Sequence, residues 1–351
     1  MGALDQCVNR LITAGTLRNA AIRVGKNDEI LIDSYFSHTD SGLCDSTLFD
    51  MASITKMIAT TSIALAAMSE GRISCDDRVE KYFSVPIDKN ELTLRHLLTH
   101  TMGFGHKNLC TKGVNYDNVA EHILSIPNDV KIGSKVLYSC PGYILLGKIL
   151  EKVLGARLDV LLKKYVTEPL GMTDTCYLPD PKGKFAPCNF RGRYFNVNDY
   201  NCEHLGGVAG NAGVFSNICD LTKYAQMLLC GGYPIVDKEI FEMAVKNYTP
   251  KHDQSRALGF LYVDEKYDQT GKLFPKGSIG HCGHTGQSLF VHPGSGLYAI
   301  ILTDATATLA RSSNDNSYDY SVVCKMRQMI HNAIAEDIGR DNKNKNLKNV
   351  I

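Results

Sequence analysis

Apolar residues recur along this chain with two spacings, one typical of strands and one typical of helices. Near the N-terminus, apolar and β-branched runs predict strands over residues 20–24 and 29–35, joined by the turn-forming sequence Gly25-Lys26-Asn27-Asp28. Later strands are predicted over residues 257–263, 287–292 and 297–303. The predicted strands therefore lie near both ends of the chain.

Between these strands, apolar residues at every third or fourth position predict helices. The predicted helices cover residues 51–69, 93–101, 118–126, 142–154, 158–165, 221–229 and, near the C-terminus, 321–338. Gly71 follows the 51–69 pattern at a position typical of a helix end, and the polar tail 339–351 is expected to fray.

This arrangement predicts two lobes. Strands at both ends predict one sheet domain built from residues 1–80 and 235–351, and the residues between them predict a mainly helical insert over 81–234. A seam between two lobes is a common place for a pocket.

Composition excludes some classes of partner. The 351 residues contain 38 Lys and Arg against 37 Asp and Glu, so no field of one sign recruits nucleic acid. Apolar runs such as 144–154 are interrupted by glycine and charged residues, so no membrane segment is expected. Met1–Arg10 lacks the apolar region of a signal peptide. The chain as given is expected in the cytoplasm, and the alternative is an exported form whose signal has been removed.

The twelve cysteines are scattered, and several stand inside apolar helical patterns. A free buried cysteine behaves as a small hydrophobic residue, and the pattern predicts reduced core residues in a reducing compartment. The chain has no Cys-x-x-Cys pair, so we expect no structural zinc, no other metal and no cofactor.

The first candidate for chemistry is Ser53-Ile54-Thr55-Lys56, in the first turn of the 51–69 helix. Positions i and i+3 share a helix face, so Lys56 can take or relay the proton of the Ser53 hydroxyl. The helix N-terminus favours negative charge developing at Ser53. Alone, the motif is equally compatible with an ordinary amphipathic helix.

Two further segments carry candidate groups. Tyr138, just ahead of the 142–154 helix, could act as a general base if it lies near Lys56, although taken alone it is better explained as a tyrosine packed at a helix start. Glycines in the 280–286 segment let the backbone approach a ligand, and a backbone N–H there could join that of Ser53 in an oxyanion hole. The alternatives for 280–286 are a turn or a His/Cys metal cluster.

Taken together, the motifs resemble the serine β-lactamases and D-alanyl-D-alanine carboxypeptidases of the class C type, with their esterase relatives. The resemblance runs from about residue 20 to residue 304. Its matching stretches are 49–56, 94–103, 138–147, 169–172, 206–216 and the segment 280–283, which stands where the family has its Lys/His-x-Gly box. It implies an α/β (α+β) fold, with an antiparallel sheet flanked by helices and built from both termini, plus an all-helical insert.

The resemblance also implies roles for single residues. Ser53 corresponds to the acylated nucleophile, Lys56 to its proton partner, and Tyr138 to the base that also protonates the leaving group. His281 stands where the family has a Lys or His that lends a donor near the substrate carboxylate. The oxyanion hole is expected from the N–H groups of Ser53 and His284.

The chain departs from the family pattern at two positions. Cys140 replaces an Asn that holds the amide side chain of a substrate, and Cys282, followed by Gly283, replaces a Thr or another small residue. All three are expected to line the substrate site. A thiol is a weak hydrogen-bond partner, so the departures bear on amide recognition more than on acylation.

These observations predict a monomeric serine hydrolase that forms an acyl-enzyme with a small-molecule or cell-wall peptide substrate. Three substrate classes stay open: β-lactams, D-amino-acid peptides and small esters. The first alternative is a penicillin-recognising sensor or binding module that acylates without turnover. The second is a His/Cys metal hydrolase, which chelation would inactivate.

Overall fold

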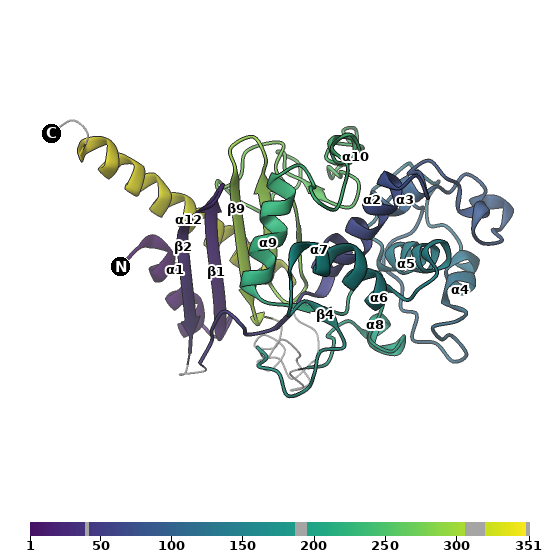
Figure 1. Ribbon diagram of the computed structural model, residues 1–351, viewed down its shortest axis with the longest axis horizontal. Helices are drawn as coiled ribbons and strands as arrows, with labels where there is room; N and C mark the ends of the chain where they lie inside the picture. Colours follow the sequence, from purple (N-terminus) through teal and green to yellow (C-terminus); the bar gives the residue numbers. More distant parts are fainter. Residues whose placement is uncertain (39–41, 187–194, 306–319, 349–351) are drawn as a thin grey trace.

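The protein has an antiparallel sheet with helices on both of its faces (Figure 1). The computed structural model describes residues 1–38, 42–186, 195–305 and 320–348, with side chains described up to residue 340. The strands are β1 (Asn19–Lys26), β2 (Glu29–Ser37), β3 (Phe49–Asp50), β4 (Cys176–Tyr177), β5 (Val214–Ser216), β6 (Leu261–Tyr262), β7 (Ile279–Cys282), β8 (Ser288–His292) and β9 (Leu297–Thr303).

Six of these strands form the main sheet in the order β2-β1-β9-β8-β7-β6, and every neighbouring pair is antiparallel. The predicted β1–β2 hairpin is present, with its turn after Lys26. Strand β1 also pairs with β9 along its length, from Ala20 opposite Thr303 to Lys26 opposite Leu297. The mixed α/β fold with a sheet built from both ends of the chain is thereby confirmed.

Strand β6 is much shorter than the predicted 257–263. The backbone turns before it, since the N–H of Ala257 donates to the carbonyl of Phe260. Gly259 has a φ of 82° and lies against the side chain of Thr61, where a Cβ atom would collide. A tertiary contact with the helical part therefore shortens the strand.

The helices are α1 (Ala3–Thr13), α2 (Ser62–Ser69), α3 (Leu94–Leu98), α4 (Val119–Ser125), α5 (Cys140–Leu154), α6 (Leu158–Leu162), α7 (Glu168–Leu170), α8 (Tyr200–His204), α9 (Ile218–Leu229), α10 (Lys238–Ala244) and α12 (Tyr320–Lys348). Helix α12 continues to Lys348, so residues 339–348 are helical where a frayed tail was expected; the last three residues lie outside the described part.

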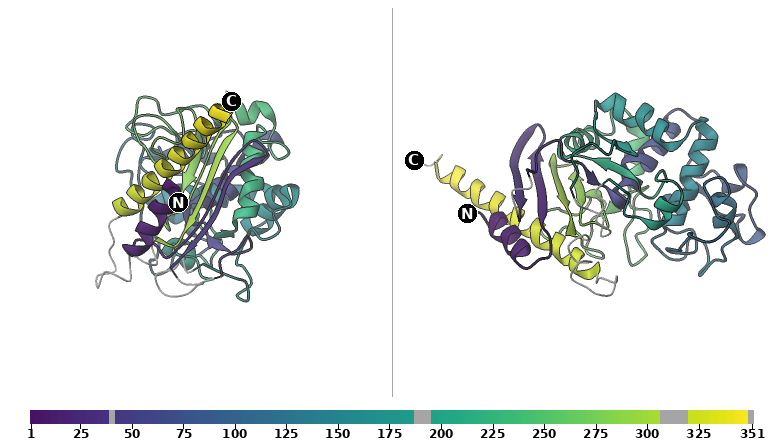
Figure 2. Two further views of the ribbon diagram at one scale, coloured as in Figure 1. Left: turned by 90° about the vertical axis from the view of Figure 1, so that its left-hand side faces the viewer. Right: turned by 90° about the horizontal axis from the view of Figure 1, so that it is seen from below.

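Helices α1 and α12 cross one face of the sheet, and α9 covers the other (Figure 2). Successive residues of β1 serve the two faces, because strand side chains alternate. Ile22 belongs to the core under α1 and α12, whereas Ala21 belongs to the core on the opposite side. Sequence analysis missed α1, although Leu4, Val8 and Leu11 are buried at helical spacing.

The division at residues 81–234 stays a prediction, and one element qualifies it. Helix α9 falls within the predicted insert, yet it contacts β1, β8 and β9 of the main sheet. The apolar face of an amphipathic helix is satisfied by any apolar surface, so its periodicity could not show which lobe it covers.

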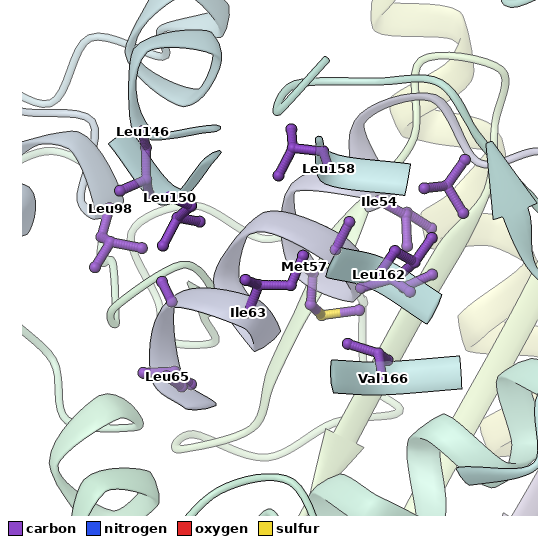
Figure 3. Packing of buried hydrophobic residues seen from close by; sticks show 14 of the residues in the cluster. Ile54, Met57, Ile63, Leu65, Leu98, Leu146, Leu150, Leu158, Leu162 and Val166 are labelled. Atoms are coloured by element: carbon purple, nitrogen blue, oxygen red, sulfur yellow. The ribbon is translucent and has the colours of Figure 1, made fainter. Parts of the chain in front are cut away.

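The predicted 51–69 helix forms, although not as one regular helix. A 3₁₀ turn, η1 (Ala52–Ile54), leads into a π-helical segment, η2 (Lys56–Thr61), and then into α2. Its apolar residues pack against α5 and α6 in the centre of the helical part (Figure 3). Figure 3 shows Ile54, Met57 and Ile63 facing this core.

By length and composition alone, one helical stretch of the described residues, Ala52–Ser69, is long and apolar enough to cross a membrane. Within the protein, 89% of this stretch is buried. A helix buried to this extent belongs to the core of the protein.

Candidate active site

Ser53 lies between β3 and the buried helical segment, in a turn held by Asp50. The N–H of Ala52 donates to Oδ1 of Asp50 at 2.7 Å, and the N–H of Asn198 donates to Oδ2 at 2.7 Å. Ala52 has a φ of 45°, a strained value for a residue with a side chain. Burial raises the pKa of Asp50 to about 6. The backbone that presents Ser53 is therefore fixed by buried hydrogen bonds.

Lys56 lies within reach of Ser53, as the i, i+3 spacing predicts. Its Nζ donates to Ser53 Oγ at 3.0 Å and to the carbonyl of Asn211 at 2.9 Å. Lys56 is fully buried, whereas Ser53 is only partly buried and lines the cavity. The lysine thus approaches the hydroxyl from the protein side and leaves the other side open.

Tyr138 completes the group around the hydroxyl. Burial raises the pKa of Tyr138 well above its ordinary value, while a hydrogen bond with the Ser53 side chain and the positive charge of Arg256 lower it. The Nζ of Lys56 is 4.9 Å from the centre of the Tyr138 ring. Tyr138 is therefore both packed at the start of α5 and close to Ser53, so the two explanations suggested by the sequence are compatible. The tertiary structure brings this residue to Ser53.

Helix α5 and a buried histidine hold Tyr138 in place. Ser139 caps α5 by accepting from the N–H of Gly142 at 3.2 Å, and its own N–H donates to Nδ1 of His100 at 3.0 Å. The His100 ring lies 4.5 Å from the Tyr138 ring, measured between centres. Burial, with the charges of Arg256 and Lys56, keeps the pKa of His100 well below its usual value, so this support is neutral.

Strand β7 brings the 280–286 segment against the nucleophile. At Gly283 an added Cβ would lie 3.0 Å from the carbonyl oxygen of Met51 and 2.8 Å from Gln287 Oε1, so only glycine fits. The side chain of Gln287 donates to the carbonyl of Asp50 at 2.8 Å. These contacts place His284, which follows Gly283, beside the turn that carries Ser53. The His284 ring is exposed and stacks on Tyr320 at 5.3 Å.

His281 differs from the donor that the family resemblance implies. Its Nδ1 is 2.9 Å from the carbonyl oxygen of Cys282, so Nδ1 carries the proton and donates, and Nε2 is left as an acceptor. Nε2 is buried without a hydrogen-bond partner. Burial, with the charges of Lys56 and Arg256, keeps the pKa of His281 well below its usual value. In this state His281 offers the cavity an acceptor.

Cys140 and Cys282 are both buried in the wall of the cavity, as expected. Cys140 is the first residue of α5, and Cys282 is the last residue of β7. Burial raises the pKa of each thiol, and the positive charges nearby lower it less. Both are therefore thiols, and not thiolates, near neutral pH.

The cavity has a volume of about 780 Å³. Six expected residues line it: Ser53, Tyr138, Cys140, His281, Cys282 and His284. Lys56 lies behind Ser53. Sequence analysis missed several other lining residues, among them Asp199, Tyr200, Arg256, Tyr267 and Tyr320. No local motif marks them, and Arg256 directly precedes a predicted strand. Nowhere in the described part of the chain do three His, Cys, Asp or Glu side chains gather as metal ligands would.

A serine held by a lysine and a tyrosine, facing the end of an antiparallel strand, defines a serine hydrolase of the acyl-transfer type. The family model described as Beta-lactamase matches residues 4–323. The chain belongs to the β-lactamase family, and it is a serine hydrolase of the β-lactamase, D-alanyl-D-alanine carboxypeptidase and esterase type.

Known proteins agree with this placement. The chain is 32% identical over 302 residues to a putative D-alanyl-D-alanine carboxypeptidase of Escherichia coli K12, covering 74% of this chain and 69% of that protein. Its fold is similar to that of a class C β-lactamase from Rhodobacter sphaeroides, with a TM-score of 0.70, 17% identity and coverage of 94% and 99%.

Two other solved structures share the fold. An octameric penicillin-binding protein homologue from Pyrococcus abyssi has a TM-score of 0.68, 21% identity and coverage of 88% and 76%. EstCE1, a hydrolase with promiscuous acyltransferase activity, has a TM-score of 0.69, 16% identity and coverage of 94% and 97%.

Proposed function

We propose that Ser53 is the nucleophile of this hydrolase, with Lys56 and Tyr138 as its proton-transfer partners. The observation that carries this proposal is the Ser53 hydroxyl itself, which accepts a hydrogen bond from Lys56 Nζ at 3.0 Å, while the same Nζ lies 4.9 Å from the centre of the Tyr138 ring. Its open side faces the cavity.

In the proposed reaction, the ionised form of Tyr138, which the charge of Arg256 and the neighbouring Lys56 favour against the effect of burial, takes the proton of Ser53 Oγ as Ser53 attacks the substrate carbonyl. The N–H groups of Ser53 and His284 stabilise the oxyanion of the tetrahedral intermediate. The bond to the leaving group then breaks, and the leaving atom takes the proton from Tyr138. A water molecule repeats the attack on the acyl-enzyme and frees Ser53.

We further propose that small esters are better substrates than penicillins. Ester hydrolysis needs the nucleophile and the oxyanion donors, whereas amide recognition also needs a strong hydrogen-bonding side chain in the wall. The structure has protonated thiols at Cys140 and Cys282 instead, and a thiol donates and accepts weakly. D-Amino-acid peptides are the second candidate class of substrate, supported by the similarity to the putative D-alanyl-D-alanine carboxypeptidase of E. coli.

Intact mass spectrometry tests the chemistry directly. The protein is exposed separately to a penicillin, an activated ester and a fluorophosphonate, with the Ser53→Ala variant as the blank. We expect one adduct per chain on Ser53, and steady turnover of a chromogenic ester. A stoichiometric burst that stops would favour the non-hydrolysing sensor, and loss of turnover on chelation would favour a metal hydrolase.

We also propose that the protein works as a monomer in a reducing compartment such as the cytoplasm. Eleven cysteines are free in the described part of the chain, and Cys188 lies outside it, so reduced thiols support this compartment. Thiol titration of the denatured protein, isolated without reductant, checks the redox state. Light scattering checks the monomer against an octamer of the kind named for the Pyrococcus abyssi homologue.

A further inference from the structure

Two turns of the chain meet at the proposed oxyanion hole, and a buried glutamine links them. The first turn follows β3 and carries Ser53, and the second joins β7 to β8 and carries His284. Gln287 closes the second turn, because its carbonyl accepts from the N–H of Gly283 at 2.8 Å. The side chain of Gln287 is fully buried and reaches back to the first turn.

The amide of Gln287 joins three parts of the fold. Its Nε2 donates to the carbonyl of Asp50 at 2.8 Å and to the carbonyl of Thr303 in β9 at 3.1 Å. Both partners are backbone carbonyl groups, which only accept, so the nitrogen of the amide is the atom that faces them. Its Oε1 accepts from the hydroxyl of Thr285. Both ends of the amide are therefore engaged.

A second side chain of the same turn reaches towards Ser53, but its contact is weaker. The Thr285 hydroxyl lies 3.3 Å from the carbonyl oxygen of Asp50, and its single proton also faces Gln287 Oε1. The Gln287 amide offers that carbonyl a proton of its own at 2.8 Å. Gln287 therefore provides the firmer of these two links between the turn of His284 and the turn of Ser53.

Close packing leaves the second turn little freedom. A Cβ atom at Gly283 would lie 2.8 Å from Gln287 Oε1 and 3.0 Å from the carbonyl oxygen of Met51. Gly283 thus packs directly against both the Gln287 side chain and the turn that presents Ser53. A change in the amide therefore moves the backbone that leads to His284, and an N–H stabilises an oxyanion only within about 2.7–3.1 Å.

We propose that Gln287 is a positioning residue, which fixes the N–H of His284 relative to that of Ser53 and thereby sets the geometry of the oxyanion hole. This inference rests on the proposed function of Ser53. Gln287 is fully buried, so it acts through the backbone and not by touching the substrate. Because the oxyanion forms only in the tetrahedral intermediate, loss of the amide slows acylation and leaves binding of the unreacted ester almost unchanged.

Gln287→Met tests the proposal, because methionine is of similar length and offers no hydrogen-bond donor. Stopped-flow acylation by 4-nitrophenyl butyrate, normalised to the sites that a fluorophosphonate labels, gives the rate constant at saturation and the half-saturating concentration. We expect the rate constant to fall by about 10- to 100-fold, since a displaced donor costs less than the loss of one altogether. The half-saturating concentration should stay nearly the same.

Phenylboronic acid reports on the oxyanion hole itself. Ser53 loses its proton and its Oγ adds to boron, which gives a tetrahedral anion with one of its two boron-bound hydroxyl groups in the oxyanion position. The inhibition constant should rise in Gln287→Met by about the factor by which the acylation rate falls, because both quantities measure binding of a tetrahedral species. A general loss of stability would change neither quantity per labelled site.

Gln287→Glu supplies a conservative rescue. It keeps the shape, and a protonated carboxyl group can donate to one of the two carbonyls, whereas a carboxylate can donate to neither. Relative to the wild type at each pH, acylation by Gln287→Glu should recover as pH falls from 8 to 5, and acylation by Gln287→Met should not. The control Thr175→Val removes a buried hydrogen bond to Asp220 at 2.9 Å and should leave both acylation constants unchanged.

The outcomes separate this inference from the proposed function. Normal acylation in Gln287→Met, or slower acylation without weaker boronate inhibition, overturns the positioning role. If Gln287→Met does not fold, Gln287→Glu decides: a pH dependence of acylation identical to that of the wild type overturns the role as well. If the wild type itself takes no adduct on Ser53, the proposed function fails and this inference fails with it.

Discussion

At the scale of single residues, the hydroxyl of Ser53 is the group on which the proposed chemistry depends. It faces the cavity and is only partly buried, so its removal leaves no unfilled space in the core. We expect Ser53→Ala to abolish covalent labelling while the melting temperature changes by no more than a few degrees. Mass spectrometry and thermal unfolding measure both quantities on one preparation. An undiminished adduct in the variant contradicts the assignment.

Lys56 and Tyr138 are expected to matter for rate. Lys56 Nζ lies 3.0 Å from Ser53 Oγ and 4.9 Å from the centre of the Tyr138 ring, and loss of a proton-transfer partner slows acylation by about two orders of magnitude or more. Stopped-flow acylation of Lys56→Ala and Tyr138→Phe by an activated ester measures the effect. Near-normal acylation in Tyr138→Phe would move the base elsewhere, first to His281, whose Nε2 is an acceptor.

The two thiols in the cavity wall test whether a cysteine does the chemistry. Both are buried with raised pKa values, so they are poorly ionised, and the proposed oxyanion donors are the N–H groups of Ser53 and His284. We expect alkylation to block activity by filling the cavity, and the double variant Cys140→Ser with Cys282→Thr to keep an acyl-enzyme at Ser53. Loss of the acyl-enzyme in the double variant, with its persistence in Ser53→Ala, would assign the reaction to a cysteine.

At the scale of elements, the end of β7 must lie close to the turn η1. Gly283→Ala would place a Cβ 3.0 Å from the carbonyl oxygen of Met51 and push the strand end away from Ser53. Because oxyanion donors act only at short range, we expect acylation to slow by about 10-fold or more. The control is Gly339→Ala in α12, where an added Cβ meets no atom within 4 Å. Equal rates in the two variants would mean that the segment following β7 does not supply an oxyanion donor.

At the scale of the whole molecule, buried neutral histidines make stability depend on pH. His331 of α12 is fully buried against β8, where its Nε2 lies 3.0 Å from Ser288 Oγ. Burial, together with the charge of Arg327, lowers its pKa to about 3, whereas unfolding restores about 6.5. Between these values the unfolded chain binds more protons, so stability rises with pH and is lost as pH falls below about 6.5.

For His331 alone this loss is about 2 kcal/mol between neutral pH and pH 5. We expect His331→Gln to flatten the dependence of the unfolding free energy on pH by about this amount, as measured by urea unfolding across pH 5 to 7. His100 and His281, whose pKa values are also lowered by burial, retain their own contributions in the variant. An unchanged slope would mean that His331 is not neutral in the folded protein.

Features that depend on neighbours in the chain followed from the sequence alone. The β1–β2 hairpin depends on its turn residues, and the contact of Lys56 with Ser53 depends on helical spacing over one turn. The strands at both ends and the collinear motifs were enough for the fold class and the family. Helix α1 could have been predicted in the same way, because Leu4, Val8 and Leu11 repeat at helical spacing.

Only the tertiary structure decided which lobe α9 covers, how short β6 is, and which groups in the cavity are charged. Each depends on residues distant in the sequence: Gly259 meets Thr61, and Tyr138 reaches Ser53 across 85 positions. The acceptor at His281 arises from burial and from the lack of a hydrogen-bond partner for its Nε2 among the described residues. Burial is a property of the packed molecule, whereas a motif records only spacing, so the sequence determined the reaction class and the packing determined the electrostatics of its site.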